Sequence, residues 1–405
     1  MGSIVMIALA GAIIVVTMLI RSGFRRIGVP SLVGFIVLGL LIRIADMQLE
    51  FITEGLSSVF DFLATVGIVF LLFRVGLEAN LAGLRRQIKP ASVIWAGGVF
   101  LNGVLGYVVA NSLLGLPLVQ SLFVAVALTA TSVAISVGVW QEAKALKSRI
   151  GQLLVDVAEL DDISGIILMA VLFAIAPVLQ EGIVPGLPSV LGKTAGLAIA
   201  KFIGFGALCL LFSRFVERHV TALFKKLEAR PGQTVVLAGF GLLIASVAGL
   251  LGFSVAIGAF FAGLTFSRDP EAVRLDTPFS ILYDFFAPFF FIGVGLSMDP
   301  SALGGAVLMG LALLVVAVTA KIVGHGLPAL ITTTWAGAVV IGVSMIPRAE
   351  ITMVIMHTGL RMGEWAVPDD VFSAMVLVSL GTAILSPLLV QQLLRRWPQA
   401  KKAKA

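Results

Sequence analysis

The sequence predicts an all-α protein that crosses a membrane many times. Of its 405 residues, 59% are hydrophobic and only 12% are charged, and the mean hydropathy is +1.09. Soluble domains carry roughly 25% charged residues, so this composition excludes a soluble enzyme. It also excludes a disordered chain, because disorder requires low hydrophobicity.

The predicted spans follow from the length that a bilayer requires, which is about 20 mostly apolar residues per helix. Thirteen stretches meet this requirement, at about 3–20, 30–45, 57–77, 90–114, 117–139, 151–178, 188–213, 231–248, 250–267, 279–297, 301–325, 331–358 and 367–393. The eighth and ninth stretches are separated only at Gly249–Gly252. The first lacks the basic segment that opens a signal peptide, so we expect an uncleaved span.

The positions of the basic residues predict the orientation. Of the 28 Lys and Arg residues, 21 lie after odd-numbered spans or in the C-terminal tail. They are Arg21, Arg25, Arg26, Arg85, Arg86, Lys89, Lys144, Lys147, Arg149, Arg214, Arg218, Lys225, Lys226, Arg230, Arg268, Arg274, Arg395, Arg396, Lys401, Lys402 and Lys404. By the positive-inside rule, the N-terminus is outside and the C-terminus cytoplasmic, in a bacterial inner (plasma) membrane. The net charge of +6 therefore indicates topology, and we expect no nucleic-acid partner.

Cofactor sites and enzymatic chemistry are not expected. The single cysteine, Cys209, excludes a disulfide framework and any multi-cysteine metal site. The three histidines, His219, His325 and His357, are too dispersed for a zinc motif. The sequence contains no nucleophile–base set, and no loop is long enough for a nucleotide-binding domain.

Acidic residues inside the predicted span 151–178 are the sharpest functional signal. A charge at mid-bilayer costs at least about 2.5–3.5 kcal/mol, yet Asp156, Glu159, Asp161 and Asp162 all lie in this span. On a helix, Asp156, Glu159 and Asp162 share one face and Asp161 is turned aside. Adjacent carboxylates in a low-dielectric site cannot both carry charge freely, so one can hold a proton. Their hard oxygen ligands also suit an alkali cation, which predicts ion exchange.

Two further spans carry features typical of an ion site. The span 117–139 contains the hydroxyl-rich run Thr129–Ser132, and the span 331–358 contains Pro347 followed by Arg348 and Glu350. Proline removes a backbone donor and predicts a break in the helix. Broken helices near the bilayer midplane direct free backbone groups at bound ions in transporters. In a purely structural alternative, the hydroxyls join helices, and the buried acids pair with Lys321 and Arg348.

The span order also predicts an internal repeat. Spans 1–6 and 8–13 form two six-helix halves joined by the seventh span. An offset of seven spans gives the halves opposite orientations in the bilayer. The two broken helices then occupy matching positions in the two inverted repeats, which points to the binding site.

Five segments together resemble the bacterial Na⁺/H⁺ antiporters of the monovalent cation:proton antiporter-2 family. They are Pro30–Gly39, Leu72–Glu78, the Asp161–Asp162 pair, Phe289–Leu296 and Pro347–Glu350. The resemblance covers essentially the whole chain. It implies a homodimer in which a core domain, at approximately 90–178 and 301–393, slides past a dimerisation domain at approximately 1–77 and 188–297.

The resemblance also assigns roles to individual residues. Asp162 matches the carboxylate that binds Na⁺ or a proton, and Asp161 matches the preceding acid, which pairs with a lysine at the position of Lys321. Thr131 and Ser132 match the interrupted helix that offers further ion ligands. Arg348 and Glu350 match an ion pair or network near the crossing.

Departures from the family pattern leave some roles open. Ala349 stands where a glycine is usual, and Asp156 and Glu159 are extra acids, either of which could partner Arg348 or alter ion preference. Potassium-efflux relatives usually carry Gln-Asp at positions 161 and 162, so the sequence favours Na⁺, or Li⁺, over K⁺.

The leading hypothesis is an electrogenic Na⁺/H⁺ antiporter that needs no cofactor and serves pH homeostasis. A K⁺/H⁺ antiporter, or a Na⁺-coupled symporter of organic anions with the same architecture, is the alternative. A membrane scaffold that transports nothing would need no acidic cluster in mid-membrane.

Overall fold

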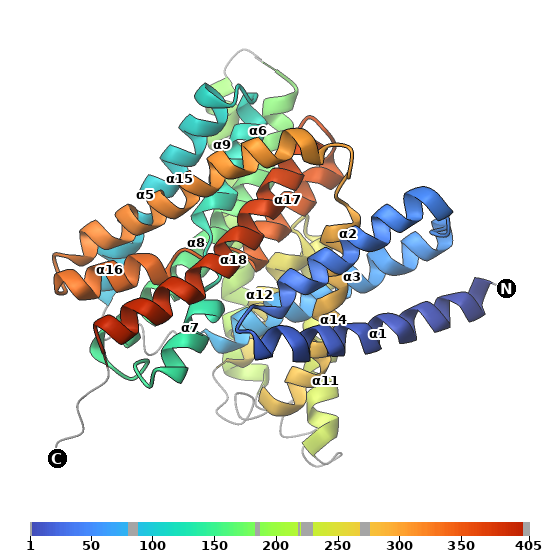
Figure 1. Cartoon of the computed structure of the whole chain (residues 1–405), viewed down its shortest axis with the longest axis horizontal. Helices are drawn as coiled ribbons and strands as arrows, with labels where there is room; N and C mark the ends of the chain where they lie inside the picture. The colour runs from blue at the N-terminus through green and yellow to red at the C-terminus, as the bar shows by residue number, and fades with distance from the viewer. Residues whose placement is uncertain are drawn as a thin grey trace. The chain divides into compact units, whose positions relative to one another are not determined.

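The computed structural model describes residues 2–79, 88–182, 187–217, 219, 230–267 and 276–399. Every regular element in these ranges is helical, which confirms the all-α prediction (Figure 1). The chain divides into two compact units. Unit 1 comprises residues 1–23, 34–80 and 186–297, and unit 2 comprises residues 24–33, 81–185 and 298–405. The predicted bounds and roles of a core domain and a dimerisation domain stay predictions, and residues 24–33, which the sequence analysis includes in the dimerisation domain, belong to unit 2.

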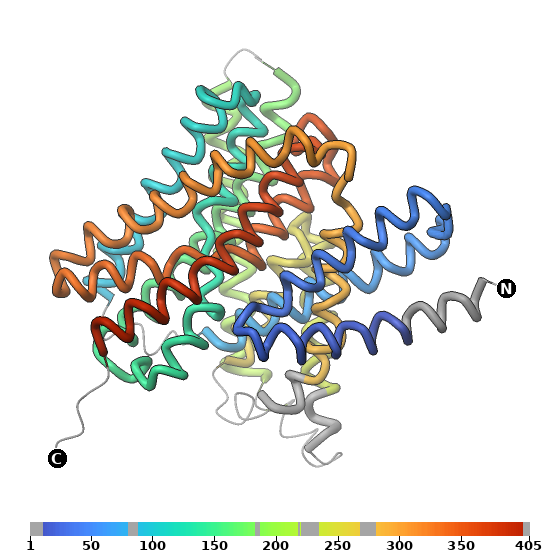
Figure 2. The backbone as a smooth tube through the Cα atoms, viewed as in Figure 1, coloured from blue at the N-terminus to red at the C-terminus, as the bar shows by residue number. Residues whose placement is uncertain are grey.

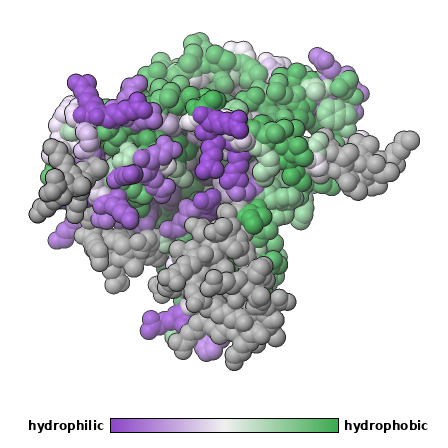
Figure 3. Space-filling model, turned by 60° about the horizontal axis from the view of Figure 1, so that its bottom comes forward, coloured by the Kyte–Doolittle hydropathy of each residue, from purple (hydrophilic) through white to green (hydrophobic). Residues whose placement is uncertain are grey.

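A membrane protein with several spans is confirmed, but the number thirteen is not. Eight helices in the described ranges are long and apolar enough to cross a bilayer. Four shorter apolar helices have 10–17 residues in those ranges: Val235–Leu250, Val255–Phe266, Ile281–Leu296 and Trp335–Ser344. The count of thirteen and the inverted repeats therefore stay predictions. Figure 3 shows hydrophobic side chains over broad stretches of the surface, as helices that face lipid require.

The predicted orientation of the termini stays a prediction. Ten of the basic residues on which it depends lie outside the described ranges: Arg85, Arg86, Arg218, Lys225, Lys226, Arg268, Arg274, Lys401, Lys402 and Lys404.

Unit 1 is built from helices that approach each other closely. Its helices are α1 (Gly2–Arg26), α2 (Ser31–Leu49), α3 (Glu54–Glu78), α9 (Leu187–Phe212), η2 (Ser213–Glu217), α11 (Arg230–Leu250), α12 (Val255–Phe266) and α14 (Asp276–Leu296). A Cβ on Gly263 of α12 would overlap the backbone oxygen of Phe73 on α3, and a Cβ on Gly76 would overlap that of Phe260. Small residues therefore bring α3 and α12 into backbone contact, a common device between membrane helices.

A tight turn separates α11 from α12, as the glycines of 249–252 predict. The helix α11 ends at Leu250, and α12 begins at Val255 after the N-cap residue Ser254. Between them Gly252 has φ +85, a conformation that residues with a Cβ rarely adopt.

Unit 2 contains the helices that surround the candidate site. They are α5 (Ile88–Val108), η1 (Val109–Leu113), α6 (Leu118–Thr129), α7 (Val133–Glu142), α8 (Arg149–Gln180), α15 (Leu303–Ala329), α16 (Trp335–Ser344), α17 (Glu350–Met362) and α18 (Asp369–Arg396). Figure 2 shows α15 and α16 running antiparallel, side by side, and α15 also packs against α5 and α18.

Two membrane helices are interrupted in unit 2. The span predicted at 117–139 is divided into α6 and α7 by Ala130–Ser132, and the span predicted at 331–358 into α16 and α17 by Met345–Ala349. The second interruption contains Pro347, where the sequence predicts it. The interruptions touch, because the backbone N–H of Ser132 donates to the carbonyl of Pro347 at 2.8 Å.

Candidate ion-binding site

The site begins with the carbonyl groups at the end of α6. The last four carbonyls of a helix have no intrahelical donors, and the helix dipole makes this end attractive to cations. Here Leu128 O accepts hydrogen bonds from the Arg348 guanidinium, and Thr129 O accepts one from Lys321 Nζ at 2.6 Å. Two side chains that the sequence places deep in the membrane therefore stabilise the interrupted end of α6.

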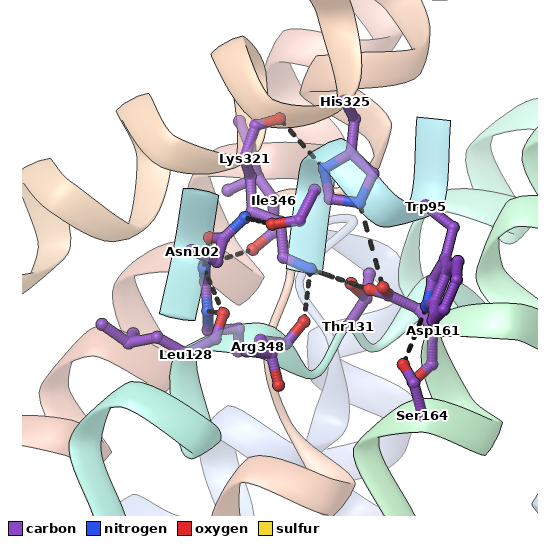
Figure 4. Close-up of polar contacts among 12 residues, drawn as sticks. Trp95, Asn102, Leu128, Thr131, Asp161, Ser164, Lys321, His325, Ile346 and Arg348 are labelled. Carbon is purple, nitrogen blue, oxygen red and sulfur yellow. Dashed lines mark hydrogen bonds and ion pairs between the residues drawn. The ribbon is translucent and has the colours of Figure 1, made fainter. Parts of the chain in front are cut away.

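Asp161 and Lys321 form a completely buried ion pair (Figure 4). Lys321 Nζ lies 2.8 Å from Asp161 Oδ2, and both side chains have no solvent-exposed surface. Thr131, in the interruption after α6, donates its hydroxyl to the same carboxylate oxygen and accepts from Lys321 Nζ at 2.5 Å. The structure thus brings together three residues that the sequence selected from three separate spans.

The second carboxylate oxygen of Asp161 faces a histidine. His325 Nε2 lies 4.0 Å from Asp161 Oδ1, beyond hydrogen-bond distance. Neither atom has a hydrogen-bond partner among the described residues. The other ring nitrogen, Nδ1, lies 3.1 Å from the backbone carbonyl of Lys321, one helical turn earlier on α15.

The backbone of Asp161 is fixed by a neighbouring pair. Trp95 on α5 donates its indole N–H to Ser164 Oγ at 2.9 Å, and Ser164 Oγ donates to the carbonyl of Asp161 at 3.0 Å. This chain of hydrogen bonds links α5 to α8 and limits rotation of α8 at the acidic pair.

Arg348 is completely buried and is held by neutral oxygens. Besides Leu128 O, its guanidinium donates to the carbonyls of Ala317 and Ile346 and to Asn102 Oδ1, the last at 2.7 Å. None of these acceptors is a carboxylate. The acceptors that the structure gives the guanidinium are thus carbonyl and amide oxygens, and the pairing of Asp156, Glu159 or Glu350 with Arg348 stays a prediction.

Asp162 differs from Asp161 in its surroundings, although the two are adjacent on α8. Its side chain is half-buried, and in the described part of the chain it makes no hydrogen bond or ion pair. It interacts electrostatically with three other carboxylates, those of Asp161, Glu159 and Glu350, and with Lys321. One carboxylate of the pair is thus committed to a lysine, whereas the other is available for a proton or a cation.

The remaining two predicted residues lie at the edge of this arrangement. Ser132 is buried between the interruptions, and its hydroxyl has no partner among the described residues. Asp156 is buried earlier on α8, and no contact in the described ranges joins it to Lys321 or Arg348.

Four residues of the site were not selected from the sequence: Trp95, Asn102, Ser164 and His325. A polar residue in the middle of an apolar span was the available signal for Asn102. For His325 the signal was its spacing of four residues from Lys321, which places both side chains on one helix face. Nothing in the sequence singled out Trp95, because tryptophan is common in membrane helices.

Comparisons with known proteins show the family and the fold of the chain. The family described as "Sodium/hydrogen exchanger, transmembrane" matches residues 11–396. The chain is 29% identical to the Na⁺/H⁺-K⁺ antiporter GerN of Bacillus cereus, over 93% of each protein. It is 28% identical to the high-affinity Na⁺/H⁺ antiporter NhaS3 of Synechocystis sp., over 87% of this chain and 76% of that one. The solved structure of the sodium proton antiporter MjNhaP1 from Methanocaldococcus jannaschii has the same fold, with a TM-score of 0.70 at 15% identity over 98% of each chain.

Proposed function

Because the chain belongs to the sodium/hydrogen exchanger family, we propose that it exchanges Na⁺, or Li⁺, for H⁺ across the bacterial plasma membrane and that this exchange is electrogenic. The observation that carries the proposal is the pair of adjacent carboxylates in unequal surroundings. Asp161 is neutralised by Lys321, and Asp162 is half-buried among other carboxylates.

In the proposed cycle, Asp162 holds either a proton or the cation. Repulsion from the neighbouring carboxylates makes a positive ion at Asp162 favourable, because like charges in a low-dielectric site cannot all persist. The cation also draws on Asp161, so its binding must displace Lys321 from that carboxylate. Protons arriving at the other face of the membrane then compete the cation off. Because one proton for one cation moves no net charge, electrogenic exchange needs a second proton, which the carboxylates beside Asp162 would hold.

Alternating access would come from movement of unit 2, the predicted core domain, in a homodimer whose contacts are made by unit 1. Unit 2 contains every residue of the candidate site, which supports its assignment as the part that carries the ion.

Two candidate cations, Na⁺ and K⁺, are consistent with the names of the relatives. The name of GerN includes K⁺ beside Na⁺, so a K⁺/H⁺ antiporter is the second candidate. The Asp161–Asp162 pair supports Na⁺, because two adjacent carboxylates match a small, strongly hydrated cation better than a large one. A symporter of organic anions would be revealed by Na⁺ flux that depends on an organic anion.

Replacing the exchangeable carboxylate tests the proposal. The variant Asp162→Asn keeps the shape of the side chain but cannot exchange a proton for a cation. In proteoliposomes with an internal pH-sensitive dye, we expect pulses of Na⁺ or Li⁺ to move protons through the unchanged protein. The same pulses, and pulses of K⁺, should produce no signal with the variant.

The matched control is Asp284→Asn in unit 1. Asp284 forms a partly exposed ion pair with Arg21 at 2.5 Å and lies outside the candidate site. We expect this variant to retain exchange. Full exchange by Asp162→Asn would remove the mechanism.

A further inference from the structure

His325 carries a lone pair that the mechanism so far does not use. Its Nδ1 is hydrogen-bonded to the carbonyl of Lys321 at 3.1 Å, and a carbonyl oxygen can only accept. Nδ1 therefore carries the ring proton, and in the neutral ring Nε2 is a bare acceptor. It faces Asp161 Oδ1, another bare acceptor, at 4.0 Å, which explains why no hydrogen bond closes this gap.

The imidazole is held in this position by α5. A Cβ on Gly98 would overlap Nε2 of His325, so the ring occupies the space that a side chain at position 98 would fill. The ring is also completely buried. An unpartnered acceptor in such a place costs free energy, and a state of the protein that supplies a donor recovers this cost.

Lys321 is a donor that loses its charged partner in the other state. In the proposed cycle the cation takes Asp161 away from it, and the ammonium keeps Thr129 O as an acceptor. A buried ammonium that loses its carboxylate is strongly destabilised. Any neutral acceptor within reach would reduce this penalty and favour cation binding.

We propose that His325 Nε2 is the second acceptor for the Lys321 ammonium, receiving it from Asp161 Oδ2 when the cation binds. The two residues are four positions apart on α15, the spacing that brings side chains together on a helix. Figure 4 shows the His325 ring and the Lys321 ammonium both directed toward the Asp161 carboxylate. His325 is thus a positioning residue that sets cation affinity through Lys321, and this role rests on the proposed function.

The test measures Na⁺ binding without requiring transport. Purified protein in detergent is titrated with NaCl at constant ionic strength, with choline chloride as the replacement salt. Thermal stabilisation reports binding, because a ligand that binds only the folded state raises its stability. For His325→Leu we expect the half-stabilising Na⁺ concentration to rise about tenfold, the effect of one lost charge-assisted hydrogen bond. His325→Gln, whose amide oxygen can accept in place of Nε2, should recover most of the affinity.

A second pair of variants moves the ring while keeping the histidine. Gly98→Ala should displace the imidazole and weaken Na⁺ binding as His325→Leu does. Gly103→Ala, on the same helix, places its Cβ in ordinary contact with the Thr129 methyl group at 3.6 Å and should leave binding unchanged.

The decisive measurement is a double-mutant cycle with Lys321→Ala. If His325 acts through the ammonium, His325→Leu should have no further effect on Na⁺ binding once Lys321 is gone. An equal effect in both backgrounds, or no effect of His325→Leu in the unchanged protein, would overturn the inference. The proposed function fails separately, through exchange by Asp162→Asn.

Discussion

The helices of the two units are held together by different kinds of contact. In unit 1, glycines bring helix backbones together and phenylalanine rings pack beside them. The ring centroids of Phe73 and Phe266, for example, lie 6.2 Å apart. The ion pairs of this unit among the described residues, Arg21–Asp284, Arg43–Asp46 and Arg74–Glu78, are partly exposed. In unit 2, completely buried charged groups tie interrupted helices together.

The difference indicates a division of labour. Close apolar packing has one stable arrangement, because interiors at crystal-like density do not deform continuously. A buried ion pair beside a second carboxylate has at least two, since a proton or cation can change which groups are paired. These differences fit the proposed roles of unit 1 as a rigid support and of unit 2 as the part that carries the ion.

Among the tests of this difference between the units, we expect the largest loss of stability from Arg348→Met in unit 2. The variant leaves the carbonyls of Leu128, Ala317 and Ile346 and the amide of Asn102 without donors. Each lost partner costs about 1–3 kcal/mol, so we expect at least about 3 kcal/mol of destabilisation. Thermal unfolding in detergent, monitored as the fraction of protein that stays monodisperse, measures this loss of stability.

The matched control is Arg74→Met in unit 1, where the guanidinium is about one-third exposed beside Glu78 and lies 4.5 Å from the Tyr283 ring. This variant should lower stability by no more than about 1 kcal/mol. Equal losses for the two variants would show that burial of charge does not distinguish the units.

The next effect concerns the voltage dependence of exchange and is expected from Lys321→Ala. Removing the only charged partner of Asp161 among the described residues lets that carboxylate take up a proton of its own in the cation-free state, so more protons, and more net charge, move per cation. One charge moved across the membrane is worth about 2.3 kcal/mol per 100 mV. Exchange in proteoliposomes with an imposed potassium diffusion potential should therefore depend more steeply on voltage. Unchanged voltage dependence would contradict the role of Lys321.

The smallest effect is expected from Gly263→Ala in unit 1. Its Cβ would meet the backbone of α3, which cannot move aside as a flexible side chain can, and overpacking of this kind costs about 1–3 kcal/mol. Gly239→Ala on α11, where nothing lies within 4 Å of the added atom, should be neutral. Thermal unfolding compares the two, and an unaffected Gly263→Ala protein would argue against rigid packing in unit 1.

The parts of this architecture that the sequence predicted are those encoded locally. Apolar stretches mark membrane helices wherever they occur, and Pro347 breaks its helix by removing a backbone donor. The residues Asp161, Thr131 and Lys321 stood out because polar groups in mid-membrane are costly. Their assembly into one cluster was expected from the resemblance, since spacing along the chain does not bring three spans together.

Other parts of the site could not be predicted, for a physical reason. The acceptors around Arg348 are mainly backbone carbonyls, which every residue possesses, so no residue type identified them in advance. The role of Gly98 depends on the ring of His325, which lies on a helix far away in the sequence. Such contacts exist only in the assembled unit.

The hydrogen bonds at the end of α6 have a consequence for synthesis of the protein. Their donors belong to Lys321, Arg348 and Thr352, all made after residues 186–297 of unit 1 have been synthesised. Until then, the carbonyl groups at the end of α6 have no side-chain donors, so water or the insertion machinery must supply their hydrogen bonds. Assembly of the end of α6 is thus a late step in folding, and it is complete only when the final helices enter the bilayer.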